Sequence, residues 1–266
     1  MDGSGSAPEA RPARSRRRWF TALTAVVVVV FGVGFFGLTS LFLGWFESPY
    51  GVAGPVTDLG YGALYGIILT MGLLVQLRSP ERKIAGVQQA ALVIPALLVA
   101  SVMGSDFQSL MTVLVLVPTL AVLWFLHPSR GDLLRRGGPF SPELLAIAVL
   151  GSIPLIGYAL TMGRQARDLP GPPHHVLRLV TMAALAIAVV FTGLLASLQT
   201  RGWRIPAWSA GAAAVVFGLA SVAFPDHPGA AGRGWGAVSI AGGVLFVGVA
   251  EWRARRTGRG IAPRRR

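Results

Sequence analysis

Eight apolar stretches, separated by short polar segments, run along this chain of 266 residues. Each stretch is close to the roughly 20 apolar residues that a helix needs to cross the hydrocarbon core of a bilayer. Only 13% of the residues are charged, whereas soluble domains usually carry about 25%. The pattern therefore predicts an all-α, polytopic integral membrane helix bundle with eight transmembrane helices and no room for a separate soluble domain.

The polar segments set the expected limits of the spans to within a few residues. The expected spans cover residues 19–46, 59–77, 84–103, 107–126, 144–162, 176–198, 205–224 and 234–250. Together they form a transmembrane domain over residues 19–250. Residues 1–18 and 251–266 are expected to be basic cytoplasmic tails, the first of them disordered. The first span is longer than the core of a signal peptide and has no clear cleavage site, so a retained helix is expected.

Arginine is distributed unevenly over the segments between these spans. With both termini inside, the inner segments hold 20 of the 24 Lys and Arg residues, and the outer segments hold three, Arg164, Arg167 and Arg233. Because basic segments are retained on the cytoplasmic side, both termini are expected in the cytoplasm and the protein in the plasma membrane. All seven tryptophans also fall near expected span ends, the depth that indole rings prefer.

Two parts of the chain resemble each other at an offset of about 120 residues. Gly72-Leu73-Leu74 aligns with Gly193-Leu194-Leu195, and Asp106 aligns with Asp226. One interpretation is a duplication, in which residues 19–126 and 143–250 form two four-helix halves related as a parallel repeat. The other is chance similarity, because Leu, Gly, Ala and Val dominate both segments.

A group of polar side chains lies near the expected outer ends of the spans. Its members are Asp58, Asp106, His174, His175, Arg178 and Asp226. His174 and Arg178 are four residues apart and share a helix face. A buried Arg178 requires a carboxylate, and Asp58 and Asp106 are the expected partners. The group is either a site for an anion, a polar headgroup or a metal, or the ordinary polarity of helix ends, in which aspartates cap helices and Arg178 reaches the headgroups.

Three prolines, Pro95, Pro118 and Pro154, fall near the middle of expected spans. Proline removes a backbone donor and kinks a helix. Such kinks expose carbonyls in transporters, but they are also common where membrane helices simply pack. Gln88 and Gln89 lie one turn inside the third span, where bonding to a neighbouring helix is the favoured interpretation.

Glycines also predict close helix contacts in two spans. Gly62 and Gly66 form a small-xxx-small pair in the second span. The last span contains Gly236, Gly242, Gly243 and Gly248.

The residue types exclude several kinds of site. The chain has no cysteine, which rules out disulfides, Fe–S clusters and thiolate metal sites. His174 and His175 alone lack the ligand spacing of a metal site, and no expected span holds the paired histidines of a b-type haem. Neither a metal nor another cofactor is expected. The net charge of +13 is carried by arginines at span ends, so the lipid bilayer, and not nucleic acid, is the expected partner.

No motif identifies a specific chemistry, so three classes of function stay open. A small-molecule transporter or permease, with a path between the two halves, is favoured by the kinked helices and the duplication. An accessory or structural subunit that binds partner membrane helices is favoured by the glycine-rich faces. A membrane enzyme that acts on lipid or isoprenoid headgroups through Asp58, Asp106 and Asp226 ranks last, because no catalytic motif is present.

Overall fold

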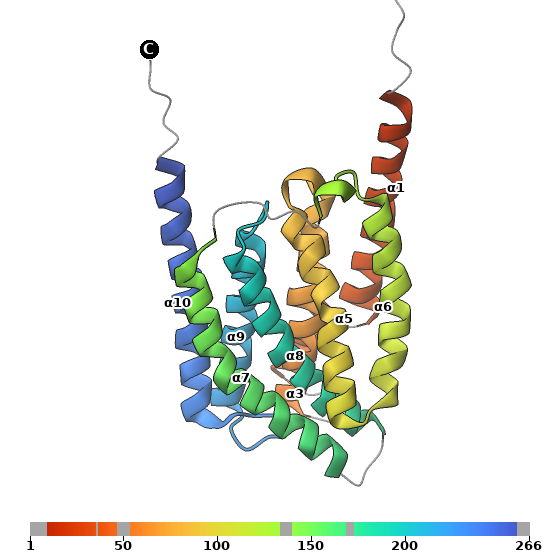
Figure 1. Ribbon diagram of the computed structural model, residues 1–266. Helices are drawn as coiled ribbons and strands as arrows, with labels where there is room; N and C mark the ends of the chain where they lie inside the picture. Colours follow the sequence, from red (N-terminus) through yellow and green to blue (C-terminus); the bar gives the residue numbers. More distant parts are fainter. Residues whose placement is uncertain (1–9, 36, 47–53, 134–139, 169–172, 260–266) are drawn as a thin grey trace, which may run out of the picture.

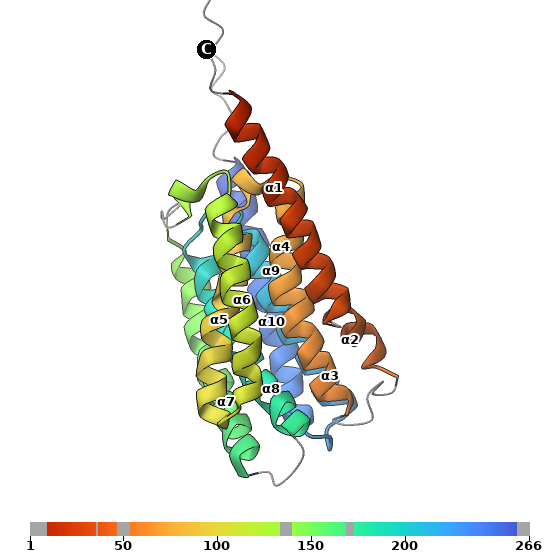
Figure 2. The same ribbon diagram turned by 90° about the vertical axis from the view of Figure 1, so that its right-hand side faces the viewer.

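A computed structural model describes residues 10–35, 37–46, 54–133, 140–168 and 173–259. Within these ranges, eight helices are long and apolar enough to span a membrane, which confirms the predicted fold class. The helices run side by side in one bundle (Figures 1 and 2). The first helix begins and the last helix ends at the same end of the bundle, the top of Figure 1. We call this the termini end; its assignment to the cytoplasm stays a prediction.

The helical segments have the following bounds. They are α1 (Ala10–Val29), η1 (Val30–Gly34), α2 (Gly37–Leu43), α3 (Pro55–Gly62), η2 (Ala63–Thr70), α4 (Met71–Leu74), η3 (Val75–Leu77), η4 (Pro80–Arg82), α5 (Ile84–Gly104), α6 (Phe107–Leu126), η5 (Arg130–Asp132), α7 (Pro142–Asp168), α8 (Pro173–Ser197), α9 (Arg204–Ala223) and α10 (Gly232–Arg259). The helix of the first span thus begins at Ala10, within the expected N-terminal tail, and α10 continues past the expected end of the last span. The division into two halves, 19–126 and 143–250, stays a prediction.

The second span departs from a regular α-helix. Its middle, η2, is a π-helix of eight residues, a form that is rare and usually short. Side chains bond to two of its carbonyl oxygens: the Thr70 hydroxyl donates to Tyr65 at 2.6 Å, and the Gln89 amide of α5 donates to Ile68 at 2.6 Å. Hydropathy did not predict the π-helical segment. One of the two side chains that bond to its carbonyl oxygens, Gln89, belongs to another helix.

The core lies around α8 and the second span. In α8, 83% of the most apolar window is buried, whereas the corresponding value is 11% in α7 and 22% in α10. α8 is therefore a central helix, and α7 and α10 lie at the periphery, where their apolar side chains face lipid. This arrangement agrees with the apolar composition of both kinds of helix, because lipid and protein interior tolerate the same residues.

Polar and small residues join the helices as the sequence predicted. The Gln88 amide donates to the carbonyl of Leu133 at 2.5 Å and accepts from the Thr200 hydroxyl at 3.0 Å. Gly62 packs on α2, because a Cβ atom at this position would lie 2.7 Å from the backbone nitrogen of Leu41. The interpretation as contacts between helices is therefore confirmed for Gln89 and Gly62, whereas Gln88 bonds to residues of two connecting segments.

Candidate functional site

A buried ion pair joins α3 to α8 near the end of the bundle opposite the termini end. The Arg178 Nη1 atom lies 3.1 Å from the Asp58 Oδ1 atom, and the two side chains are 15% and 2% exposed. The guanidinium carbon lies 4.6 Å from the centroid of the Tyr61 ring, a cation–π distance. Asp58 belongs to the first turn of α3, where the helix dipole favours a negative charge. The expected carboxylate partner of Arg178 is therefore Asp58.

The Asp58 carboxylate is held by charge more than by hydrogen bonds. Neither of its oxygens accepts a hydrogen bond of good geometry from a described residue, although both are buried. The contact with Arg178 is close in distance but does not meet the angles of a hydrogen bond. Removing either charge would leave the other one buried and without compensation, which is costly in a low-dielectric environment.

The remaining residues of the predicted polar group do not join this pair. Asp106 caps α6: its carboxylate accepts from the backbone nitrogens of Gln108 and Ser109, each at 3.0 Å. His174 and His175 begin α8 with their rings 4.8 Å apart, and Asp226 is exposed between α9 and α10. Asp106 thus has the capping role that was the alternative to a binding site.

The described part of the chain contains no group of three or more His, Asp or Glu residues placed to hold a metal ion. Asp58, Asp106 and Asp226 also have different surroundings: an ion pair, a helix cap and an exposed loop. The geometry thus gives these three carboxylates no common site.

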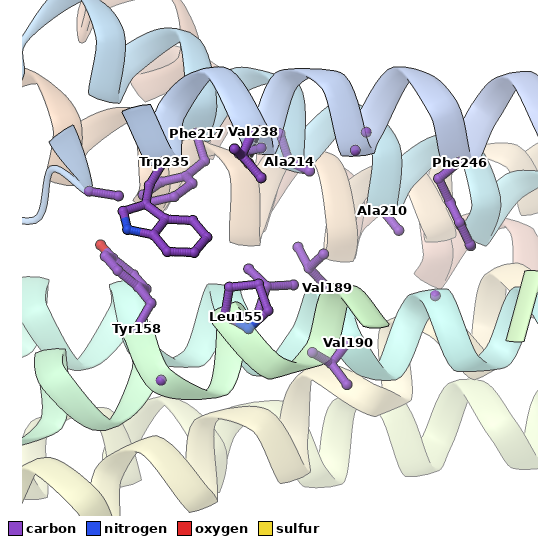
Figure 3. A pocket seen from close by; sticks show the side chains of 18 of the residues that line it. Leu155, Tyr158, Val189, Val190, Ala210, Ala214, Phe217, Trp235, Val238 and Phe246 are labelled. Atoms are coloured by element: carbon purple, nitrogen blue, oxygen red, sulfur yellow. Dashed lines mark hydrogen bonds between the residues drawn. The ribbon is translucent and has the colours of Figure 1, made fainter. Parts of the chain in front are cut away.

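A second site is a groove of about 650 Å³ between α7 and α10, with α8 and α9 beneath it (Figure 3). Tyr158 of α7 and Trp235 of α10 face each other across it. The Tyr158 hydroxyl donates to the carbonyl of Gly229 at 2.5 Å, and the remaining lining is mostly apolar. Concave, mostly apolar sites of about 300–1,000 Å³ with a few polar groups are the usual binding sites of small ligands.

The groove lies beside α7, which packs along α8 and also meets α10 at one end and α5 at the other. Near the termini end, the Arg253 Nη1 atom of α10 lies 2.6 Å from the Glu143 Oε2 atom of α7. At the opposite end, Gly163 of α7 packs on Met103 of α5, whose Cβ would lie 2.9 Å from an added Cβ. α7 therefore slants away from α10 along its length (Figure 1).

Glycines keep the groove wide. Gly151 and Gly157 of α7 and Gly242 of α10 line it, and a Cβ atom added at any of them would meet no atom within 4 Å. The interpretation of Gly242 and Gly248 as close helix contacts is therefore wrong, because both glycines face open space. Gly236 and Gly243 of the same helix do pack closely, on α9.

The sequence of α7 contains a pattern that indicates the groove, although none of its residues alone identifies a binding site. Lining positions of α7 recur at alternating steps of three and four residues, which places them on one helix face. They are Gly151, Pro154, Tyr158, Thr161 and Gln165. A face of small and polar residues in an otherwise apolar helix indicates a cavity or a helix contact, and only the structure distinguishes the two.

No protein-family model, curated protein or solved structure matches the chain. The functional conclusion therefore depends on the geometry of the ion pair and of the groove.

Proposed function

We propose that this multi-pass membrane protein is permease-like and takes up an amphiphilic small molecule sideways from the bilayer into the groove between α7 and α10. The groove itself carries the proposal: its volume is about 650 Å³, within the range of small-ligand sites. It lies inside the second predicted half, between α7 and α10, and not between the two halves as the sequence interpretation had expected.

The position of the groove favours entry from lipid. Both helices that border it are peripheral, with most of their apolar surface exposed to the bilayer. A ligand that enters between them does not have to cross a polar entrance, and it meets a lining in which apolar residues predominate. An apolar tail gains from this lining, whereas a fully polar solute would lose its hydration without replacement.

The size of the groove favours a small ligand over a partner helix. A transmembrane helix of about 20 residues is about 30 Å long and about 10 Å wide, which corresponds to roughly 2,400 Å³. A groove of about 650 Å³ does not enclose such a helix. An accessory subunit could therefore lie only across its mouth, and this second function has less support.

Filling the groove tests the proposal. We would reconstitute the protein in nanodiscs of phosphatidylglycerol and phosphatidylcholine in equal amounts, transfer it to mild detergent, and measure the retained lipid by native mass spectrometry. Gly242→Leu fills the groove. Gly248→Leu is the matched control, because Gly248 lies on the same helix and also faces open space but is not part of the lining.

We expect the wild-type protein and Gly248→Leu to retain a lipid molecule that Gly242→Leu loses. In proteoliposomes, Gly242→Leu should also slow the movement of a fluorescent phospholipid between leaflets by at least about tenfold, as expected when a pocket is blocked. Equal lipid retention in the two leucine variants would overturn binding in the groove. Equal movement rates with unequal retention would overturn the permease-like role.

A further inference from the structure

The groove is polar at one end only. Thr161 and Gln165 of α7 and Trp235 of α10 supply a hydroxyl, an amide and an indole N–H near the end opposite the termini end. Toward the termini end, the lining includes Ile147 and Phe246 and carries no polar side chain. An amphiphile therefore fits in one orientation, with its polar group beside Gln165 and its tail toward Phe246.

The polar end has donors available for a ligand. Thr161 uses its hydroxyl hydrogen on the Gly157 carbonyl at 3.0 Å, which leaves its oxygen free to accept. Among the described residues, neither the Gln165 amide nor the Trp235 indole nitrogen has a hydrogen-bond partner, and both side chains are exposed. Two kinds of N–H donor are thus available at this end of the groove.

Two arginines lie close in the sequence to residues of this end of the groove. Arg164 precedes Gln165, and it follows Gly157 by seven residues and Thr161 by three, so helical spacing places it at the edge of the groove face of α7, outside the lining itself. Arg233 is two residues before Trp235. Neither arginine forms an ion pair with another described residue. Two exposed guanidinium groups that form no ion pair, in addition to the N–H donors, match a phosphate in charge and hydrogen bonding.

We infer that the occupant is a lipid with an anionic phosphate headgroup, bound with the headgroup near Arg164 and Gln165 and the acyl chain along the apolar part of the groove. This inference rests on the proposed function and names the class of molecule that the groove takes up. A free phosphate ion is a poorer match, because it would leave the apolar part of the groove empty. A lipid fills both parts and reaches the groove from the bilayer.

The same native mass spectrometry identifies the headgroup, because the two lipids differ in mass. For the lipid that the wild-type protein retains and Gly242→Leu loses, we expect phosphatidylglycerol to exceed phosphatidylcholine by about fivefold. This ratio corresponds to the attraction between about one arginine and an anionic surface. Arg164→Gln should bring this ratio close to one while a lipid is still retained.

Arg167→Gln is the matched control. Arg167 follows Gly163 by four residues, so it lies on the face that packs against α5 and not on the groove face. We expect its phosphatidylglycerol preference to equal that of the wild-type protein. Addition of 10-fold molar excess inorganic phosphate should leave the retained lipid in place, and its displacement would indicate a site for free anions.

The outcomes separate this inference from the proposed function. A retained lipid that is lost in Gly242→Leu but shows no headgroup preference would overturn the inference and leave the groove proposal standing. A preference that Arg164→Gln and Arg167→Gln reduce equally would also overturn it, since the effect would then come from general surface charge. No groove-dependent lipid at all would overturn both.

Discussion

α10 meets its two neighbours in opposite ways. Against α9 it packs through glycine: a Cβ on Gly218 would lie 2.5 Å from the Gly236 carbonyl oxygen, and the Ser239 hydroxyl donates to Ala214 at 2.8 Å. Against α7, the glycines border open space. Similar residues thus produce a closed contact on one side of α10 and a groove on the other.

The difference shows that glycine in a membrane helix does not by itself define a contact. Close packing arises where two glycine faces are held parallel, because dispersion is the main attraction between helices in lipid. α7 instead packs on α8 along its length and on α5 at the end opposite the termini end. The closed part of the bundle, around α3, α8 and α9, should consequently be sensitive to substitution, and the groove should tolerate it.

The largest expected effect comes from the buried charge of the closed part. Asp58→Asn leaves the Arg178 guanidinium without its carboxylate, and the free energy of unfolding should fall by about 3–5 kcal/mol. Titration with sodium dodecyl sulfate, followed by circular dichroism, would measure it. Asp226→Asn, at an exposed position, is the control and should change stability by less than about 0.5 kcal/mol. Equal effects of the two variants would mean that the ion pair contributes nothing.

His127 gives the stability of the bundle a pH dependence. It is buried beyond the end of α6, against the edge of Phe20, and burial lowers the pKa of His127 to about 4. The unfolded chain binds this proton below about pH 6.5, whereas the folded chain does not until about pH 4. Stability is therefore complete above pH 6.5 and falls by about 3 kcal/mol as the pH drops to 4.

The contribution of His127 can be isolated with His127→Asn. The Asn side chain can still accept from the backbone nitrogen of Ser129, which His127 Nδ1 does at 3.1 Å, but it does not titrate. The free energy of unfolding of this variant in detergent should change less than that of the wild-type protein between pH 6.5 and pH 4. An unchanged slope would show that other groups cause the pH dependence.

The smallest effects compare the two sets of glycines directly. Gly218→Ala forces a methyl group against backbone and should destabilise the protein by about 1–3 kcal/mol. Gly157→Ala faces open space and should stabilise it by up to about 1 kcal/mol, because alanine favours helix. The same unfolding titration measures both. A destabilising Gly157→Ala would mean that α7 closes onto α10.

The sequence predicted those features of the structure that depend on composition or on residues close together in the chain. The eight spans follow from apolar length. The cost of a buried guanidinium limited the expected partner of Arg178 to Asp58 or Asp106, and only the structure selected Asp58. The capping role of Asp106 was one of two interpretations, and only the position of α6 selected it. Tyr158 and Trp235 were not recognised as a pair, because 77 positions separate them.

By itself, the sequence determined that this chain is a bundle of membrane helices, because lipid selects apolar segments by their length. Tertiary structure decided which glycines touch another helix and which border a groove. The physical reason is that the spacing of residues along the chain decides which of them share one helix face, whereas contacts with other helices set the angle between two helices. For α7 those contacts are its packing along α8, the Arg253–Glu143 pair at one end and the packing of Gly163 on Met103 at the other.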